Sequence, residues 1–362
     1  HHTDHRHTHS IPIHIRHRSD SRHTQILQYI GDCHRCSILA YNGGYLFTAL
    51  SFVIYFAANQ KLQTTNEHVG IRMRFLIVDA FSKRLFGGNP AGIVILPKGL
   101  DFPSDETMVK TAAELRYSET AFVSIMGDNE FQTRYFTPAA EVALCGHATV
   151  GAFCALAHLG IIRKEDTCIN HTMAGDLEIE VGDGYVMMDM ATPKEILTIS
   201  DEDSLRELYN VLGSEYEKTM GLLPEIISTG LPDIIVPFPS KEALNAITPN
   251  MKALAALSER YNVVGVYAFS VATEGNLTAH TRDFAPLYDI DEEAATGTSS
   301  GALTYYLYKN HLIENNSEVI FSQGEAMGRP SEIKATLCLS GGKCKVKVGG
   351  NAVILAEGEI YL

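Results

Sequence analysis

The chain lacks the marks of several common classes of protein. It carries 29 Lys and Arg against 43 Asp and Glu, a formal net charge of −14. The basic excess of most nucleic-acid-binding proteins is therefore missing, and we expect no nucleic-acid partner. Its seven cysteines follow no framework spacing, which argues against a small disulfide-bonded scaffold and favours reduced thiols in the cytoplasm. The sequence also has neither a phosphate-binding loop nor a dinucleotide-binding fingerprint.

What is present is an ordinary globular composition. Hydrophobic residues make up 45% and charged residues 20% of the 362 positions, values that exclude a wholly disordered or collagen-like chain. The length suits one large domain or two domains of average size.

Charge and histidine are unevenly distributed along the chain. Residues 1–72 hold 10 of the 15 histidines, with 7 Lys and Arg and 4 Asp and Glu. Residues 73–362 therefore carry 22 Lys and Arg and 39 Asp and Glu, a net charge of −17. Because the composition changes near Met73, itself a natural start, we expect residues 1–72 to be an N-terminal extension outside the fold.

The first 35 residues are biased in composition and show no hydrophobic period of 2 or 3.6, which predicts disorder. Their histidines and the Cys33-x-x-Cys36 pair offer metal binding as an alternative. The spacing completes no zinc motif, so we predict no metal site here.

Residues 36–60 contain no charged side chain and lie between Arg35 and Lys61. Such a segment is long enough to span a bilayer, which takes about 20 mainly apolar residues. Its more apolar centre, residues 45–58, also suits the core of a signal peptide. We expect a cytoplasmic protein, with membrane contact only if residues 36–60 act as an anchor.

Short apolar runs separated by turn residues dominate the rest of the chain. Residues 177–181 and 185–190, for example, flank Gly182-Asp183-Gly184, which predicts a β-hairpin. Most runs follow one another too closely for a helix between each pair of strands. Antiparallel sheet is therefore favoured over a doubly wound parallel sheet.

Two amphipathic helices are predicted over residues 104–116 and 248–260, the first with Ser104 as its N-cap. Two further helices, beginning at Gly146 and Gly297, are rich in small residues and almost free of charge, which predicts burial on all sides. Since each lies among strands, we expect two similar halves. A helix start presents unpaired N–H groups and partial positive charge, so two facing starts would hold a carboxylate. The alternative is that the glycines at the two helix starts serve only to allow close packing.

Eight short stretches of the chain occur in the order typical of one family: residues 78–81, 86–92, 118–123, 134–138, 145–149, 284–286, 293–298 and 327–331. On these stretches, residues 73–362 resemble the phenazine-biosynthesis, PhzF-like isomerase family, whose fold is shared with diaminopimelate epimerase. Each stretch is weak alone, but the ordered set covers nearly all of these residues.

The resemblance implies an α+β fold of two pseudo-symmetric halves, each a curled antiparallel sheet or barrel around one central helix, with the active site between them. The implied first half spans residues 73–190 and the second spans residues 191–351. Residues 352–362 are expected to return as a strand of the first half. The resemblance also suggests a homodimer.

The resemblance further implies a chemistry. Family members of known activity move a proton between carbons of a small carboxylate substrate, without metal or organic cofactor. Glu119 matches the position of their acid/base; in general, burial that raises a carboxyl pKa toward the working pH improves such a base. Gly146 and His147 match substrate-binding positions at the first helix start, and Gly297 and Thr298 match those at the second.

Two positions depart from the family pattern. Glu293, a further substrate-binding candidate, stands where many members have Asp, and Thr298 stands where many have Ser. Thr keeps the hydroxyl, whereas Glu keeps the charge but reaches one methylene further. The departures bear on the identity of the substrate more than on the class of reaction.

Cys145 allows three interpretations. In the epimerase relatives a cysteine here is one of two opposed bases, but residues 291–301 contain no second cysteine, so racemase chemistry is disfavoured. A Cys145/His147 nucleophile is disfavoured because residues two apart on a helix do not face each other. A partly buried small apolar side chain accounts for Cys145 best.

The leading hypothesis is therefore a cofactor-independent isomerase with Glu119 as its single acid/base. The alternative is a non-catalytic protein that kept the fold and binds a small molecule or a partner. The departures at Glu293 and Thr298, together with the N-terminal extension, motivate this alternative.

Overall fold

The computed structural model describes residues 70–217, 221–273 and 275–362. The chain divides into two units, His1–His68 and Val69–Leu362. The predictions for segments 1–35 and 36–60 therefore fall outside the described residues. Among the helices that are described, none is long and apolar enough to cross a membrane.

The first half of the folded unit is a ring of strands around one helix. Its elements are β1 (Arg72–Ala80), β2 (Asn89–Ile95), α3 (Asp105–Leu115), β3 (Thr120–Gly127), β4 (Glu130–Phe136), β5 (Glu141–Val142), α4 (Gly146–His158), β6 (Thr167–Thr172), β7 (Gly175–Val181) and β8 (Tyr185–Asp189). Strands pair in the order β1–β2–β3–β4–β6–β7–β8. The last strand of the chain, β17 (Lys343–Tyr361), pairs with both β8 and β1 and closes the ring.

Helix α4 lies inside this ring because its sequence offers no charged face. Its side chains are small or apolar and are buried almost without interruption from His147 to Leu156. Strands β1, β2, β8 and β17 pack against it, as expected for a helix that is apolar on all sides. Phe153 meets Phe131 edge-on, with ring centroids 5.4 Å apart.

The second half repeats this plan around helix α8. Its elements are β9 (Lys194–Thr198), α5 (Glu202–Val211), β10 (Glu225–Ser228), β11 (Pro232–Pro237), α6 (Lys241–Asn245), α7 (Met251–Tyr261), β12 (Val266–Val271), β13 (Ala279–Ala285), η2 (Pro286–Tyr288), β14 (Ile290–Glu293), α8 (Gly297–Lys309), β15 (Glu318–Gln323), η3 (Glu325–Met327) and β16 (Ser331–Ser340). Strands pair in the order β9–β10–β11–β12–β13–β15–β16–β17.

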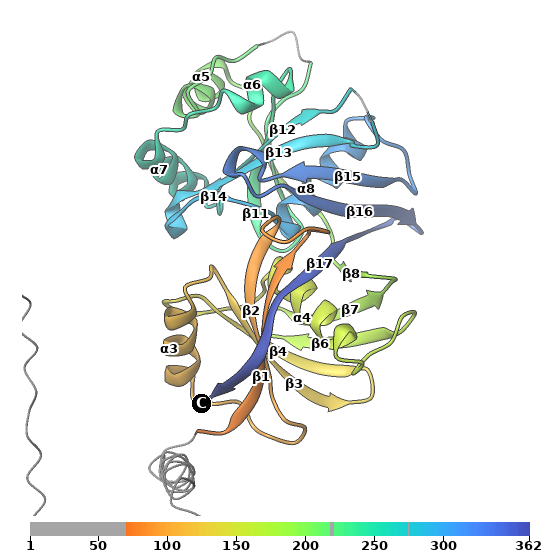
Figure 1. Ribbon diagram of the computed structural model, residues 1–362. Coiled ribbons are helices and arrows are strands. Elements are labelled where there is room, and N and C mark those ends of the chain that lie inside the picture. The colour runs from red at the N-terminus through yellow and green to blue at the C-terminus, as the bar shows by residue number, and fades with distance from the viewer. Residues whose placement is uncertain (1–69, 218–220, 274) are drawn as a thin grey trace, which may run out of the picture. The chain divides into compact units, whose positions relative to one another are not determined.

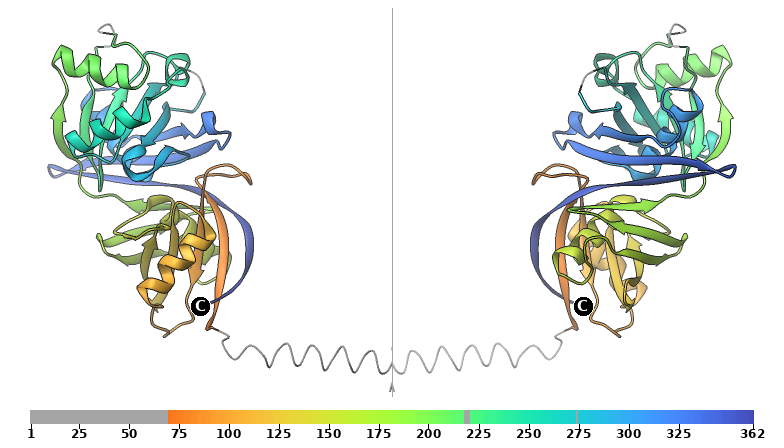
Figure 2. Two further views of the ribbon diagram at one scale, coloured as in Figure 1. Left: turned by 90° about the vertical axis from the view of Figure 1, so that its left-hand side faces the viewer. Right: turned by 90° about the vertical axis from the view of Figure 1, so that its right-hand side faces the viewer.

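Strand β17 belongs to both halves (Figure 1). It pairs with β16 over residues 343–349, with β8 over residues 347–351, and with β1 over residues 352–361. Both side views in Figure 2 show it as one long curved ribbon running from the second half along the first. The helix-centred halves and their shared strand confirm the predicted α+β fold of the diaminopimelate epimerase type.

Several local predictions are confirmed. Helix α3 lies within the predicted range, and the Ser104 side chain accepts a hydrogen bond from the Thr107 N–H. Helix α7 matches the prediction over residues 248–260. Strands β7 and β8 pair antiparallel, with Val181 opposite Val186 across the Gly182–Gly184 turn.

Two expectations need correction. The sheet is not purely antiparallel, since the pairs β2–β3, β4–β6, β11–β12 and β13–β15 are parallel. Each of these pairs encloses at least one helix between its strands, because parallel neighbours need a crossover connection. The folded unit also begins before Met73: β1 starts at Arg72, and Ile71 and Leu362 exchange backbone hydrogen bonds of 2.5 and 3.1 Å.

Candidate active site

The two buried helices begin against each other. A Cβ placed on Gly146 would lie 3.4 Å from the Gly297 Cα, and one on Gly297 would lie 3.6 Å from the Gly146 Cα. Both would also lie 3.1 Å from the Met188 Cε. A side chain at either position would therefore contact the other helix start and press on the flexible end of Met188.

Neither helix start is capped by a side chain. Cys145 and Thr296 occupy the N-cap positions in extended conformations, and neither side chain bonds a helix N–H. The first N–H groups of α4 and α8 are therefore without the side-chain partner that usually satisfies them. Two such ends side by side suit an anionic ligand group.

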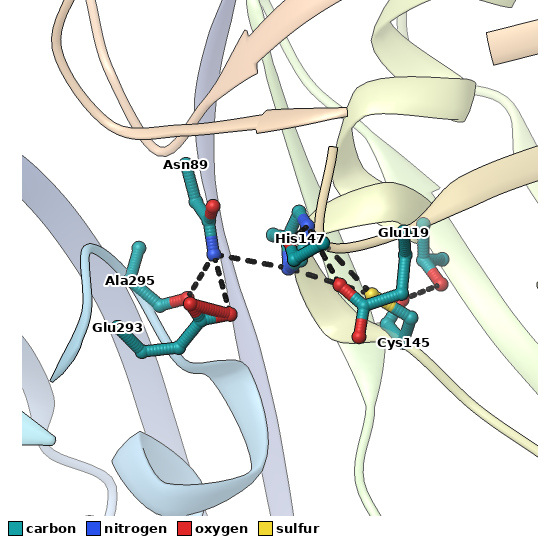
Figure 3. A network of polar contacts seen from close by, with 8 residues as sticks. Asn89, Glu119, Cys145, His147, Glu293 and Ala295 are labelled. Atoms are coloured by element: carbon teal, nitrogen blue, oxygen red, sulfur yellow. Dashed lines mark hydrogen bonds and ion pairs between the residues drawn. The ribbon is translucent and has the colours of Figure 1, made fainter. Parts of the chain in front are cut away.

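Glu119 and His147 meet at the first of these helix starts (Figure 3). Glu119 immediately precedes β3, and His147 lies in the first turn of α4. The Glu119 Oε2 lies 3.3 Å from the His147 Nε2, and the two side chains are 14% and 5% exposed. The distance is short enough for an ion pair if His147 is protonated, but the contact is not a hydrogen bond, and this buried Oε2 has no hydrogen-bond partner.

Asn89 connects this pair to the second half of the fold. Its amide Nδ2 lies 3.2 Å from the His147 Nδ1 and donates to the Glu293 Oε1 at 3.0 Å and the Ala295 carbonyl at 3.1 Å. Asn89 is the first residue of β2, whereas Glu293 ends β14. Figure 3 shows Asn89 between the histidine and the second acid. Three predicted site residues, Glu119, His147 and Glu293, thus belong to one cluster.

Burial sets the protonation of this cluster. It raises the pKa of Glu293 to about 8, with a further upward contribution from Glu119 that the Asn89 hydrogen bond partly offsets. It also lowers the pKa of His147, although Glu119 opposes that shift. At neutral pH Glu293 is therefore mainly a neutral carboxylic acid and His147 a neutral imidazole.

Cys145 takes part in the same cluster, which sequence reasoning missed. Its Sγ lies 3.4 Å from the His147 Nδ1. The rule that residues two apart on a helix diverge fails here because Cys145 is the N-cap, with φ −140° and ψ 114°, and stands outside the helix. Burial and the nearby Glu119 raise the pKa of its thiol well above the ordinary value, so an activated thiolate nucleophile is not favoured.

The remaining predicted residue, Thr298, lies in the first turn of α8 and is buried. Its carbonyl accepts a 2.8 Å hydrogen bond from the Thr229 hydroxyl, and its Cγ2 faces Gly230. Thr298 thus lies beside Gly297 at the second helix start. It takes no part in the hydrogen bonds that Asn89 makes.

An arginine from the second half holds the loop that leads into Asn89. Arg329 donates to the Asp79 Oδ1 at 2.7 Å and to the carbonyls of Gly87 and Gly88 at 2.9 Å. Asp79 in turn accepts from the Phe86 N–H at 2.8 Å. The sequence stretches 86–92 and 327–331 therefore meet here, which explains why both belong to the ordered set.

Matching arginine–glutamate pairs hold the segments that lead into the two helices. Arg134 makes a bidentate pair with Glu141, and Arg282 makes one with Glu292. Each guanidinium also lies over the ring of the phenylalanine two positions further on. Glu141 and Glu292 each stand five residues before a helix start. The site is thus built from two copies of one local arrangement, of which only the second carries the acid Glu293.

A cavity of about 650 Å³ lies elsewhere on the folded unit. Lys164, Tyr185, Lys334 and Lys347 are among its lining residues, and the predicted site residues are not. Lys164 is paired with Asp183. Because the unusual protonation states and the facing helix starts occur together around Glu119, we place the candidate active site there.

The chain thus combines an α+β fold of the diaminopimelate epimerase type with an acid cluster at two facing helix starts. Comparison with known proteins identifies its family. Residues 78–358 match the family described as phenazine biosynthesis-like protein (PhzC-PhzF). The chain therefore belongs to the phenazine biosynthesis-like family.

Individual relatives agree with this assignment. An uncharacterized isomerase of Clostridium acetobutylicum is 34% identical over 79% of this chain and 97% of its own length. The trans-2,3-dihydro-3-hydroxyanthranilate isomerase of Pseudomonas aeruginosa is 29% identical over 80% and 99%. The crystal structure of a PhzF-family phenazine biosynthesis protein from Bacillus anthracis matches with a TM-score of 0.71 and 27% identity, over 81% of this chain and all of that one. The chain is an enzyme of the isomerase class.

Proposed function

We propose that this protein moves a proton from one carbon to another on a small carboxylate substrate, with Glu119 as the acid/base and without a cofactor. The observation that carries the proposal is the pairing of Glu119 with a second buried acid, Glu293, across Asn89 and His147. Burial keeps Glu293 mainly protonated at neutral pH, and a buried acid in such a state is typical of proton-transfer sites.

The geometry supports the following proposed roles. Glu119 takes the substrate C–H proton and becomes a carboxylic acid, and it then returns that proton to a second carbon as the double bond shifts. The electrons left at the first carbon move toward the substrate carboxylate, and the free N–H groups at Gly146 and Gly297 would stabilise the developing charge. Glu293, as a neutral acid, can donate a hydrogen bond to the same substrate.

Side-chain chemistry supports a small substrate with at least one carboxylate. We propose that Gly146 and His147 contact it from the first helix start and that Gly297, Thr298 and Glu293 contact it from the second. The longer Glu293, in place of the family's usual Asp, would reach one methylene further toward the substrate. A homodimer remains a prediction, which light scattering of the purified full chain tests.

Hydrogen exchange at carbon tests the proposal directly. The full chain is incubated in D₂O with a panel of small unsaturated and amino carboxylates, and deuterium entry at carbon is followed by proton NMR. We expect exchange with the wild type and a loss of at least about 100-fold in Glu119→Gln. Glu114→Gln, an exposed carboxylate on α3, is the matched control and should exchange at the wild-type rate.

Exchange in Glu119→Gln at the wild-type rate would overturn the assignment of the base. Ligand-induced shifts without exchange of any panel compound would instead favour the alternative of a small-molecule-binding protein that kept the fold.

A further inference from the structure

The N-cap residue of α8 does not cap its own helix. Threonine usually caps well, because its hydroxyl oxygen can accept a hydrogen bond from the N–H two or three positions further on. The Thr296 side chain makes no such bond. Its hydroxyl instead donates to the Asp283 Oδ2 at 2.5 Å and accepts from the Gln323 Nε2 at 3.1 Å. We propose that Asp283 is a positioning residue, which holds the Thr296 hydroxyl away from the N–H groups of α8 so that a substrate carboxylate can bind them.

Asp283 is buried where a bond to Thr296 is worth keeping. It lies on β13 and is 4% exposed. Within residues 70–217, 221–273 and 275–362, the Thr296 hydroxyl is the donor that this carboxyl has, since its other oxygen is buried without a hydrogen-bond partner. A buried oxygen that loses its donor pays the full cost of having left water. The carboxyl therefore competes well with the helix N–H groups for the Thr296 hydroxyl.

The first half of the fold lacks this acid, and its N-cap lacks a hydroxyl. Cys145 is the N-cap of α4, and sulfur is only a weak hydrogen-bond acceptor. Tyr135 corresponds to Asp283, because each follows the arginine of its own bidentate pair and precedes a phenylalanine. The Tyr135 hydroxyl bonds Thr149 and Asn170 instead of the N-cap. The acid thus occurs in the half whose N-cap residue could otherwise close its own helix start.

The charge state of Asp283 suits an anionic ligand. Burial raises its pKa well above the ordinary value, and the nearby Asp233, itself buried, raises it further. At neutral pH Asp283 is therefore a neutral acid, which can accept the Thr296 hydroxyl and adds no negative charge beside a substrate carboxylate. Asp233 accepts from the Ser299 hydroxyl at 2.6 Å, so both acids hold the first turn of α8.

Without Asp283, the Thr296 side chain would be free to rotate about χ1 and cap α8. A substrate carboxylate would then have to displace the hydroxyl. The KM should rise and kcat should change little, because the hydroxyl is displaced in the bound complex and in the transition state alike. This effect on binding rests on the proposed function, whereas the rotation of Thr296 does not, so the two are measured separately.

NMR measures the rotation without any substrate. The full chain is labelled with carbon-13 and nitrogen-15 threonine, and three-bond couplings of the methyl carbon to the backbone report χ1. The Thr296 signal is assigned by its loss in Thr296→Val. We expect the wild-type rotamer in Asp283→Asn, whose amide oxygen can still accept the hydroxyl, and a different rotamer in Asp283→Ala.

An unchanged Thr296 rotamer in Asp283→Ala overturns the proposal, whether or not a substrate is known. Thermal melts show which variants fold. Asp283→Val, which also removes the acceptor, takes the place of Asp283→Ala if the alanine variant does not fold.

Steady-state kinetics measure the effect on binding, with a panel compound that exchanges hydrogen at carbon. We expect the KM of Asp283→Ala to rise about fivefold, the typical effect of one capping bond, with little change in kcat. Adding Thr296→Val should return the KM to near the wild-type value, because no hydroxyl is left to cap the helix. Thr304→Val is the matched control for this second substitution, because it removes another buried hydroxyl of α8, one that donates to the Ser300 carbonyl. Asp283→Ala with Thr304→Val should keep the raised KM.

A KM that stays raised in Asp283→Ala with Thr296→Val overturns the proposal, because Asp283→Ala would then have weakened the second half in general. Equal recovery with Thr304→Val overturns it as well. If no panel compound exchanges, the proposed function fails instead, and the Thr296 rotamer still decides the role of Asp283.

Discussion

Gly146 and Gly297 begin the two buried helices so close together that a methyl group on either would contact the Cα of the other. The contact joins the two halves at the point where both helices begin without a side-chain cap. It therefore fixes the separation of the two ends that would hold a substrate carboxylate. The consequences for binding and for stability can be measured separately.

Gly146→Ala should weaken substrate binding more than it weakens the fold. The added Cβ would lie 3.1 Å from the flexible end of Met188, while alanine gains up to about 1 kcal/mol of helix propensity, so the net stability change should stay within about 1 kcal/mol. The KM should rise, because the methyl group enters the region of the helix N–H groups. Urea unfolding and steady-state kinetics measure the two effects.

Gly151→Ala is the control for this substitution. It lies on the same helix, and its Cβ would meet Ile93 and Val78 at ordinary distances of 3.5–3.6 Å. Its KM should equal that of the wild type. A normal KM in Gly146→Ala would contradict the binding role of this helix start.

Glu293 should make stability depend on pH. Its pKa is about 8 in the folded protein against an ordinary 4.5, so the folded state binds the proton more tightly than the unfolded state. This contribution is complete below about pH 4.5 and is lost as the pH rises toward 8. The contribution of Glu293 to the unfolding free energy should fall by on the order of a few kcal/mol between pH 5 and 8.

Glu293→Gln should reduce that loss, because the amide does not titrate. Urea unfolding at both pH values measures the difference, and the exposed Glu114→Gln should behave like the wild type. Equal losses in Glu293→Gln and the wild type would show that another group is responsible.

Asn89→Ala should destabilise the fold by about 2–3 kcal/mol, because it leaves the buried Glu293 and Ala295 oxygens without their donor. It should also raise the pKa of Glu293 further, since the Asn89 hydrogen bond lowers that pKa. Carbon-13 NMR titration of the side-chain carboxyls measures the second effect. The control is Asn351→Ala, which removes one surface hydrogen bond, to the Gly184 carbonyl, and should change neither the stability nor the Glu293 pKa by much. If the Glu293 pKa does not change in Asn89→Ala, the Asn89 hydrogen bond does not set that pKa.

Arg282→Lys should destabilise the second half by about 2–4 kcal/mol. Lysine cannot form the bidentate pair with Glu292, and the carbonyls of Leu244 and Ile247 would lose the guanidinium that now donates to them. Urea unfolding gives the difference. Arg206→Lys, at an exposed i,i+4 pair, should change stability by less than about 0.5 kcal/mol. Equal effects of the two substitutions would show that the buried pair contributes no more than an exposed one.

The fold could be predicted from the sequence because its signals are local. The two small-residue helices, the hairpin at residues 182–184 and the Ser104 N-cap each depend on adjacent residues. The ordered stretches then supplied the architecture. The parallel strand pairs were missed because they join segments separated by whole helices, which no local spacing reveals.

The candidate site was predicted in part for the same reason. Glu119, His147 and Glu293 were identified from motifs, but their connection through Asn89 depends on contacts between residues 58 and 204 positions apart. The orientation of Cys145 depended on whether it lies inside α4 or just before it. A shift of one residue in the helix boundary thus decides whether the Cys145 side chain faces His147.

Strand β17 determines the order in which the fold can be completed on the ribosome. Strands β1 and β8 emerge early, yet each pairs on one edge with β17, which is synthesised after the whole second half. Until β17 emerges, the first ring has two open edges, the kind of exposed backbone that invites wrong pairing. The half that is made first is thus the half that closes last.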